Sequence, residues 1–148
     1  GRETKEMHKR GIRLRHLGRL DRLPERLQQE VLKSIELTRN NERMTLSVAF
    51  DYGGRAEIIE ATKRMLRDKV SPDAVDEALV GSYLYTAGIP DPDLIIRTAG
   101  EMRLSNFLMW QSAYSGYYFT PVFWPDFDAE EVRKALLAYS QRARNFGA

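Results

Sequence analysis

Residues 93–107 read Asp-Leu-Ile-Ile-Arg-Thr-Ala-Gly-Glu-Met-Arg-Leu-Ser-Asn-Phe and are the most informative part of the chain. Its first six residues form a short segment with the apolar centre Leu94-Ile-Ile, which predicts a buried strand that Gly100 brings to an end. Arg97 stands at the end of this strand, and Arg103 and Ser105 follow in the loop that leaves it. The stretch therefore predicts a polar site at the carboxyl end of a core strand.

Similar apolar segments recur on both sides of this stretch. Strands are predicted at 12–17, 45–50, 93–98 and 117–120, and helices at 24–38, 58–66, 71–79, 106–114 and from Asp128 onward, with Val132, Leu136, Tyr139 and Ala143 on one face of the last helix. Strands that alternate with helices predict an α/β fold with a mostly parallel sheet flanked by helices. Because no repeat, linker or low-complexity segment interrupts the chain, residues 1–148 are predicted to form a single domain.

The composition excludes several classes of protein. The chain has 148 residues, of which 43% are hydrophobic and 30% charged, as in soluble globular proteins. It has no cysteine, so disulfides, Cys-based zinc sites and thiolate catalysis are ruled out, and its two histidines, His8 and His16, are too few for a His-rich metal site. No apolar run is long enough to cross a bilayer or to form a secretory signal, which predicts a cytoplasmic protein.

The net charge of +2 is unevenly distributed, because lysines and arginines outnumber acids in the first 22 residues. Such a bias can bind nucleic acid or an anionic membrane surface. The basic residues alternate with Leu14, Leu17 and Leu20, however, which favours a solvated face. Without a recognition motif, we predict no nucleic-acid partner and at most peripheral membrane contact.

Arg97, Arg103 and Ser105 are the candidate binding residues. In α/β sheets, ligands collect beyond the carboxyl ends of the strands. A guanidinium contacts two oxygens at once and keeps its charge, so a pair of arginines suits a diphosphate, and a serine adds a neutral donor. Glu101, between the arginines, either orients one of them by ion pairing or is a solvated loop residue.

Three other features allow two interpretations each. Gly53-Gly54 favours a tight turn into a helix over a phosphate-binding loop. Asp126 and Asp128 resemble a carboxylate pair, but the neighbouring Pro125 favours a turn and a helix cap. Aromatic residues between 107 and 124 either pack in the core or line a lipid tunnel or a dimer interface.

Together these motifs resemble the cis-prenyltransferase (undecaprenyl diphosphate synthase, or isoprenyl transferase) family. The resemblance runs from about His8 to Gly147, the C-terminal two thirds of the family's length. Its matching blocks are 31–41, 45–46 with 52–58, 97–107, 110–114, 124–127 and 142–147. No Asp-Asp-x-x-Asp motif is present, as expected of cis rather than trans synthases.

The resemblance implies a transferase that condenses isopentenyl diphosphate with an allylic diphosphate, such as farnesyl diphosphate, to give an undecaprenyl-type cis-polyprenyl diphosphate. It also implies Mg²⁺ as cofactor and a homodimer. Isopentenyl diphosphate is expected at Arg97, Arg103, Leu104 and Ser105, with Glu101 supporting them.

Two departures from the family pattern leave alternatives open. The family's Asp-Gly-Asn-Gly-Arg loop, which supplies the catalytic aspartate, is not in these 148 residues, so no catalytic residue is expected here and this chain alone is expected to be inactive. A family glutamate that helps to bind Mg²⁺ corresponds to Gly116, which has no side-chain ligand. A catalytically silent subunit or fragment and a short-chain or branching prenyl diphosphate synthase are the alternatives.

Overall fold

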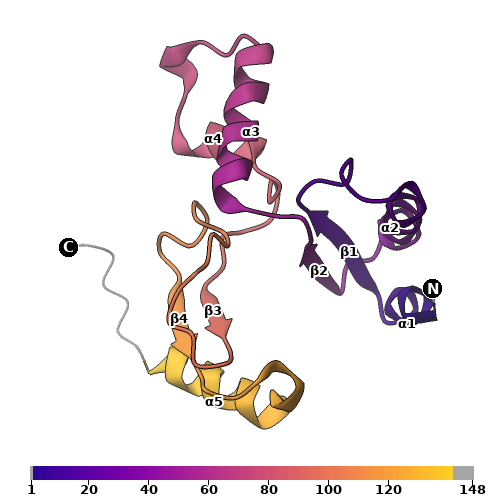
Figure 1. Cartoon of the computed structure of the whole chain (residues 1–148), viewed down its shortest axis with the longest axis vertical. Helices are drawn as coiled ribbons and strands as arrows, with labels where there is room; N and C mark the ends of the chain where they lie inside the picture. Colours follow the sequence, from indigo (N-terminus) through magenta and orange to yellow (C-terminus); the bar gives the residue numbers. More distant parts are fainter. Residues whose placement is uncertain (1, 142–148) are drawn as a thin grey trace. The chain divides into compact units, whose positions relative to one another are not determined.

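The computed structural model of the protein describes residues 2–141. Its contacts group into two compact units, Gly1–Ala87 (unit 1) and Gly88–Ala148 (unit 2), which Figure 1 colours in sequence order. The single domain predicted over 1–148 stays a prediction. The block 142–147 and Ala143, assigned above to a motif and to the last helix, lie outside the described residues.

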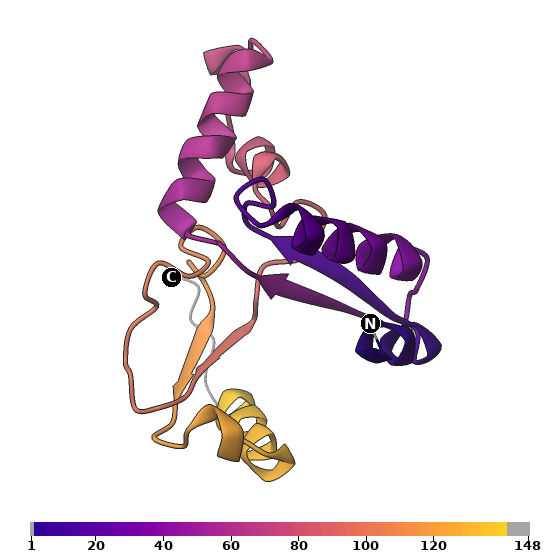
Figure 2. The same cartoon turned by 45° about the vertical axis from the view of Figure 1, so that its right-hand side comes forward.

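Unit 1 is built on two parallel strands joined by a helix. Its elements are α1 (Arg2–Lys9), β1 (Ile12–Leu17), α2 (Glu25–Thr38), β2 (Met44–Ala49), α3 (Gly54–Arg67), a 3₁₀ turn (Pro72–Ala74) and α4 (Glu77–Tyr83). The register pairs Ile12 with Met44 and Leu17 with Ala49. Two neighbouring parallel strands need a crossover connection, and α2 supplies it. The helix lies along the sheet (Figure 2). In α2, Leu27, Val31 and Ile35 recur at every fourth residue.

The C-terminal end of α2 also covers the outer edge of β1. The fully buried Thr38 hydroxyl accepts from the Leu14 N–H at 3.0 Å, and Asn41 Nδ2 donates to the Ile12 carbonyl at 2.7 Å. The Leu14 N–H and the Ile12 carbonyl face away from β2, so neither forms a hydrogen bond to a strand of the described chain. Side chains at and just beyond the C-terminal end of α2 therefore take the place of a neighbouring strand.

A buried glutamate organises the rest of unit 1. Glu57 is 2% exposed in the first turns of α3, where it accepts from the Tyr52 hydroxyl and, at 2.7 Å, from the Tyr85 N–H. Arg15 Nη2 on β1 donates to the carbonyls of Tyr85 at 3.3 Å and Ala87 at 3.0 Å. The segment 85–87 is thus tied to both the strand and the helix.

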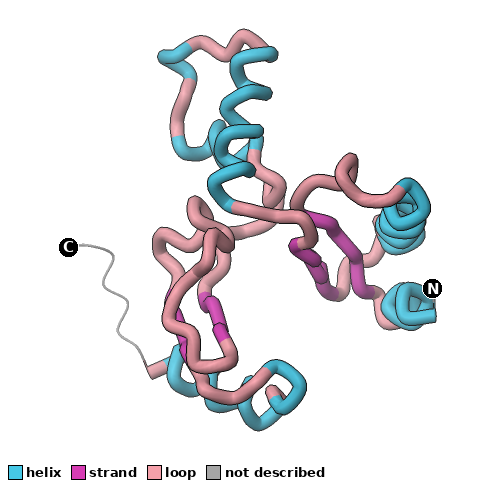
Figure 3. The backbone as a smooth tube through the Cα atoms, viewed as in Figure 1, coloured by secondary structure: helices cyan, strands magenta, loops and turns pink. Residues whose placement is uncertain are grey.

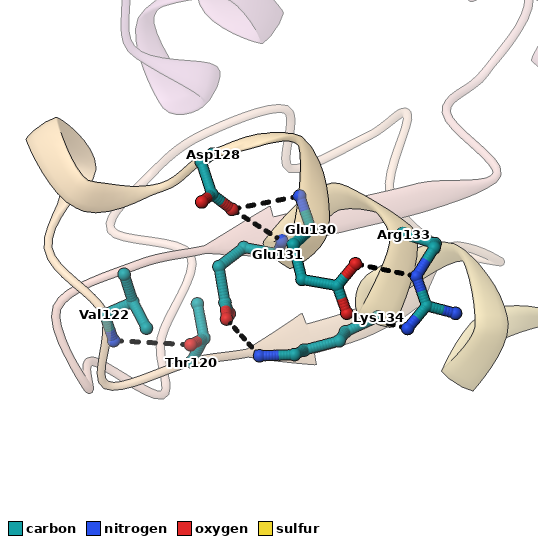
Figure 4. Close-up of polar contacts among 7 residues, drawn as sticks. All are labelled: Thr120, Val122, Asp128, Glu130, Glu131, Arg133 and Lys134. Atoms are coloured by element: carbon teal, nitrogen blue, oxygen red, sulfur yellow. Dashed lines mark hydrogen bonds and ion pairs between the residues drawn. The ribbon is translucent and has the colours of Figure 1, made fainter.

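Unit 2 contains β3 (Leu94–Arg97), β4 (Gly116–Phe119), a 3₁₀ turn (Trp124–Asp126) and α5 (Ala129–Ser140). The strands are parallel, with Leu94 opposite Gly116 and Arg97 opposite Phe119. Asp128 caps α5 by accepting from the N–H groups of Glu130 at 2.9 Å and Glu131 at 3.0 Å, and both glutamates then pair with bases one turn on (Figure 4). This cap confirms the interpretation of Asp128 as a helix start.

The predicted α/β fold with parallel strands is confirmed, but two predicted helices are wrong in detail. Residues 106–114 form successive turns rather than a helix, and the whole segment between β3 and β4 is loop in Figure 3. The reason is that Asn106 and Leu108 have φ of 66° and 45°, which no α-helix contains. The helix predicted over 71–79 is a 3₁₀ turn followed by α4, which begins anew at the Asp76 cap.

Candidate functional site

The candidate site lies at the carboxyl end of β3, wholly within unit 2. Arg97 ends the strand, and its Nη1 donates to the Arg103 carbonyl and, at 3.0 Å, to Ser105 Oγ. The structure thus brings Arg97, Arg103 and Ser105 together, as their spacing predicted. The guanidinium of Arg97 also holds the loop that carries the other two.

That loop closes through a tight turn at 104–107. The Phe107 N–H donates to the Leu104 carbonyl at 3.1 Å, and the two central residues, Ser105 and Asn106, have φ of 51° and 66°. Two successive positive φ values are the signature of a type I′ turn. Neither residue is a glycine, so the turn holds strained backbone next to the candidate site.

Arg103 forms the second half of the site. Its Nε lies 3.0 Å from Glu101 Oε2, and the two side chains are 67% and 45% exposed. Of the two interpretations of Glu101, the structure shows the ion pair. Because exposed pairs contribute only about 0–1 kcal/mol, a diphosphate could take the place of Glu101 at small cost.

A cavity of about 220 Å³ adjoins these residues. Arg97, Arg103 and Leu104 line it together with apolar side chains from β3, the loop and β4, namely Ile95, Ile96, Phe107 and Phe119. Ser105 is not among the lining residues and reaches the site through Arg97. The arrangement offers two cations beside an apolar wall, which suits a small amphiphilic anion.

Larger cavities lie in unit 1. One of about 370 Å³ runs between α2 and the two strands and is lined mostly by leucine, isoleucine, valine and phenylalanine side chains. Another, of about 460 Å³, contains Arg19 and Arg64, but Asp21 and Glu60 also line it and neutralise that charge. Size alone therefore does not identify the anion site.

Gly116 lies at the opposite end of the strand pair from the arginines. It faces Leu94 at the start of β3, three residues before Arg97, which corresponds to about 10 Å along a strand. The Tyr139 ring covers it: a Cβ on Gly116 would lie 3.2 Å from Tyr139 Cδ2, and the Tyr139 hydroxyl donates to Asp93 Oδ1 at 3.2 Å. Position 116 and Arg97 therefore lie at opposite ends of the β3–β4 pair within this chain.

The described residues form no ready-made Mg²⁺ site. Among residues 2–141, no group of three or more histidine or carboxylate side chains is placed to hold a metal ion. Glu101 is engaged by Arg103, and Gly116 has no ligand atom.

No helix in the described part of the chain is long and apolar enough to cross a bilayer.

Two residues of this region were missed from the sequence. Asn106 could have been found, since asparagine after serine in a loop is a frequent turn signal. Tyr139 carries no such signal, because its contact with position 116 joins α5 to β4 across the fold.

Parallel strands with paired arginines beyond a carboxyl strand end are typical of an α/β protein whose ligand is an anion. The family model described as putative undecaprenyl diphosphate synthase matches residues 1–147, so the chain belongs to that family.

Curated relatives agree with this assignment. An isoprenyl transferase of Heliobacterium mobile is 49% identical in an alignment of 150 positions that covers 99% of this chain and 58% of that protein. One of Fusobacterium nucleatum is 50% identical over 145 residues, covering 98% of this chain and 62% of its own length. The chain thus spans about three fifths of the length of these relatives.

Solved structures share the fold. Lavandulyl diphosphate synthase from Lavandula x intermedia, in complex with dimethylallyl diphosphate, matches with a TM-score of 0.93 and 38% identity over 99% of this chain and 65% of that chain. A probable undecaprenyl diphosphate synthase from Campylobacter jejuni matches with a TM-score of 0.88 and 30% identity over 99% of this chain and 68% of that chain. The prediction of the cis-prenyltransferase family is confirmed.

Proposed function

We propose that this protein is a transferase that condenses isopentenyl diphosphate with an allylic diphosphate, such as farnesyl diphosphate, to give an undecaprenyl-type cis-polyprenyl diphosphate. The observation that carries the proposal is the gathering of Arg97, Arg103 and Ser105 beside a small apolar cavity. The names of the relatives support it at the level of prenyl transfer.

In this proposal the chain's own residues bind and orient isopentenyl diphosphate. Arg103 exchanges Glu101 for diphosphate oxygens, while Arg97 and Ser105 offer donors to the same group and Leu104 lines the cavity. Ile95, Phe107 and Phe119 contact the five-carbon tail. The reaction then joins the double bond of that tail to C1 of the allylic partner, breaks the partner's C–O bond to diphosphate and releases a proton. We assign no catalytic residue within 1–148.

Mg²⁺ is proposed only as a cofactor of the family. Mg²⁺ is usually held by few carboxylates together with substrate phosphates and water. Because Gly116 has no side-chain ligand atom and Glu101 is paired with Arg103, substrate phosphates and water would supply most of the ligands of the ion beside this chain.

Two other functions have specific support. A catalytically silent subunit is supported by Gly116, where the family pattern has a carboxylate. A short-chain or branching synthase is supported by the likeness to lavandulyl diphosphate synthase, whose crystal holds dimethylallyl diphosphate. The lengths of extracted products separate these from the undecaprenyl-type function.

We also propose a cytoplasmic homodimer with at most peripheral membrane contact and no nucleic-acid partner. Large apolar side chains exposed in unit 2 support a protein interface there, among them Trp124, Phe123 and Leu136.

The test is a transfer assay on the full-length gene product with radiolabelled isopentenyl diphosphate, farnesyl diphosphate and Mg²⁺. We expect labelled polyprenyl product from the wild type and a strong loss in Arg97→Ala. Arg133→Ala is the matched control, since this arginine pairs with Glu130 on the surface of α5 and should leave the rate unchanged. No labelled product from the folded wild type would contradict the transferase proposal and favour the silent subunit.

A further inference from the structure

The turn at 104–107 needs an explanation, because it places two non-glycine residues in the left-handed region. Ser105 and Asn106 have φ of 51° and 66°. Among residues with a Cβ, asparagine and aspartate enter this region most readily, because their short polar side chains bond locally to the backbone. Serine has no such ease, so Asn106 is the residue that makes the turn attainable.

The turn fixes groups that the candidate site uses. Its first residue, Leu104, follows the carbonyl of Arg103, and its second is Ser105; Arg97 Nη1 donates to both the Arg103 carbonyl and Ser105 Oγ. If the turn opened, Ser105 would swing away from Arg97 and the contact of 3.0 Å would be lost. The orientation of the Arg97 guanidinium therefore depends on the backbone at position 106.

Strain is concentrated along the same loop. Ala99 before the turn and Leu108 after it also have positive φ, at 65° and 45°. Such conformations persist where the surroundings enforce them, and they cluster at binding sites. The loop is thus held in one shape at several points, and position 106 is the one best suited by residue type.

We propose that Asn106 is a positioning residue for diphosphate binding, which acts by holding the left-handed turn that presents Ser105 to Arg97. This inference rests on the proposed function of the site. It concerns the backbone that Asn106 adopts, and it assigns the residue no direct contact with substrate.

The test compares Asn106→Gly with Asn106→Val in the full-length protein. Glycine adopts positive φ freely, whereas a β-branched residue resists it. We expect the KM for isopentenyl diphosphate to stay within about threefold in Asn106→Gly and to rise about tenfold or more in Asn106→Val. The KM for the allylic substrate should not change in either variant. Asn40→Val is the matched control, an exposed asparagine without positive φ.

Other results would contradict the positioning role of Asn106. An equal rise in KM for Asn106→Gly and Asn106→Val would assign the effect to the asparagine side chain and overturn the positioning role, as would no rise in either. If Asn106→Val melts below the assay temperature, its binding of isopentenyl diphosphate is measured by calorimetry below that melting point, and wild-type affinity there overturns the inference. If the wild type is active and the KM for isopentenyl diphosphate is unchanged in Asn106→Val, this inference alone is contradicted. If the wild type is inactive, the proposed function is contradicted.

Discussion

The two arginines of the site are held in different ways, and this difference predicts different roles. Arg97 is fixed by two oxygen acceptors of its own loop, whereas Arg103 is held by one exposed carboxylate. A guanidinium held by the loop is pre-oriented, and one held by an exposed ion pair can be released to a ligand. Arg103 is therefore the arginine that should respond most directly to bound diphosphate.

Replacing Arg103 tests that role. In Arg103→Ala we expect the KM for isopentenyl diphosphate to rise about 10- to 100-fold, since a charge-assisted hydrogen bond contributes about 1.5–3 kcal/mol. The KM of Arg103→Lys should lie between those of the wild type and Arg103→Ala, because lysine keeps the charge but cannot contact two oxygens at once as a guanidinium does. Steady-state kinetics with Arg133→Ala as control decide the matter, and an unchanged KM in folded Arg103→Ala would remove this residue from the site.

Gly116 illustrates how a neighbouring side chain limits substitution. Its φ lies outside the left-handed region, so the backbone itself accepts other residues. The obstacle is the Tyr139 ring, at 3.2 Å from the position of a Cβ. A side chain at this position requires the ring to move by a few tenths of an ångström, and this movement strains the hydrogen bond to Asp93.

We therefore expect Gly116→Glu to lower the free energy of unfolding by about 1–3 kcal/mol, the usual cost of overpacking. In a Tyr139→Ala background the same change should cost much less, because the ring is gone. Gly81→Ala is the control: no atom lies within 4 Å of its Cβ position, and it should gain up to about 1 kcal/mol. Chemical denaturation of the four variants of this cycle gives the coupling, and additive effects would show that Tyr139 does not restrict position 116.

At the scale of elements, α2 and β1 are joined by side-chain hydrogen bonds as well as by apolar contact. Thr38 Oγ1 accepts from the Leu14 N–H and donates to the Ser34 carbonyl at 2.9 Å, so both capacities of the hydroxyl are used in a buried position. An isosteric residue without the hydroxyl leaves the Leu14 N–H unsatisfied.

Thr38→Val should accordingly lower the free energy of unfolding by about 1–3 kcal/mol, the cost of a buried donor left without a partner. Thr62→Val is the matched control, because the Thr62 hydroxyl bonds only to the Ile58 carbonyl on an exposed helix face. That change should stay within about 0.5 kcal/mol. Equal losses in the two variants, measured by urea unfolding, would show that the edge of β1 does not depend on Thr38.

Elements with a clear apolar period were predictable from the sequence, and those set by backbone conformation were not. The strand predicted at 12–17 matches β1, and the spacing of Leu27, Val31 and Ile35 located α2. The segment 106–114 has apolar residues dense enough to resemble a helix, yet positive φ at Asn106 and Leu108 prevents one. Nothing predicted α1, whose contacts with α2 and β1 give it a place in the fold.

The site follows the same division. Arg97, Arg103 and Ser105 could be located because the end of a strand fixes their place along the chain. The contact between Tyr139 and position 116 could not, because it depends on how α5 packs against β4, and 23 residues separate the two positions. Contacts between distant segments leave no periodic trace in the sequence.

Within residues 2–141, each unit contains two parallel strands. Parallel sheets of folded proteins are normally covered on both faces and have more strands. In unit 1, one face of β2 and the residue after it carry large apolar side chains that remain about half exposed: Met44 (50%), Val48 (48%) and Phe50 (53%). The matched region is about three fifths of the relatives' own length, so in a protein as long as they are we expect further chain to cover this surface.

We expect the 148-residue chain, expressed alone, to bind a hydrophobic dye such as ANS and to form no prenyl product. The exposed apolar face of β2 accounts for the dye. The family's Asp-Gly-Asn-Gly-Arg loop, which is not in these 148 residues, accounts for the expected inactivity. The full-length gene product, at equal molar concentration, should bind less dye and transfer label from isopentenyl diphosphate to farnesyl diphosphate. Labelled product from the 148-residue chain would mean that it holds a complete active site, and equal dye binding by both proteins would mean that further chain does not cover the Met44, Val48 and Phe50 surface.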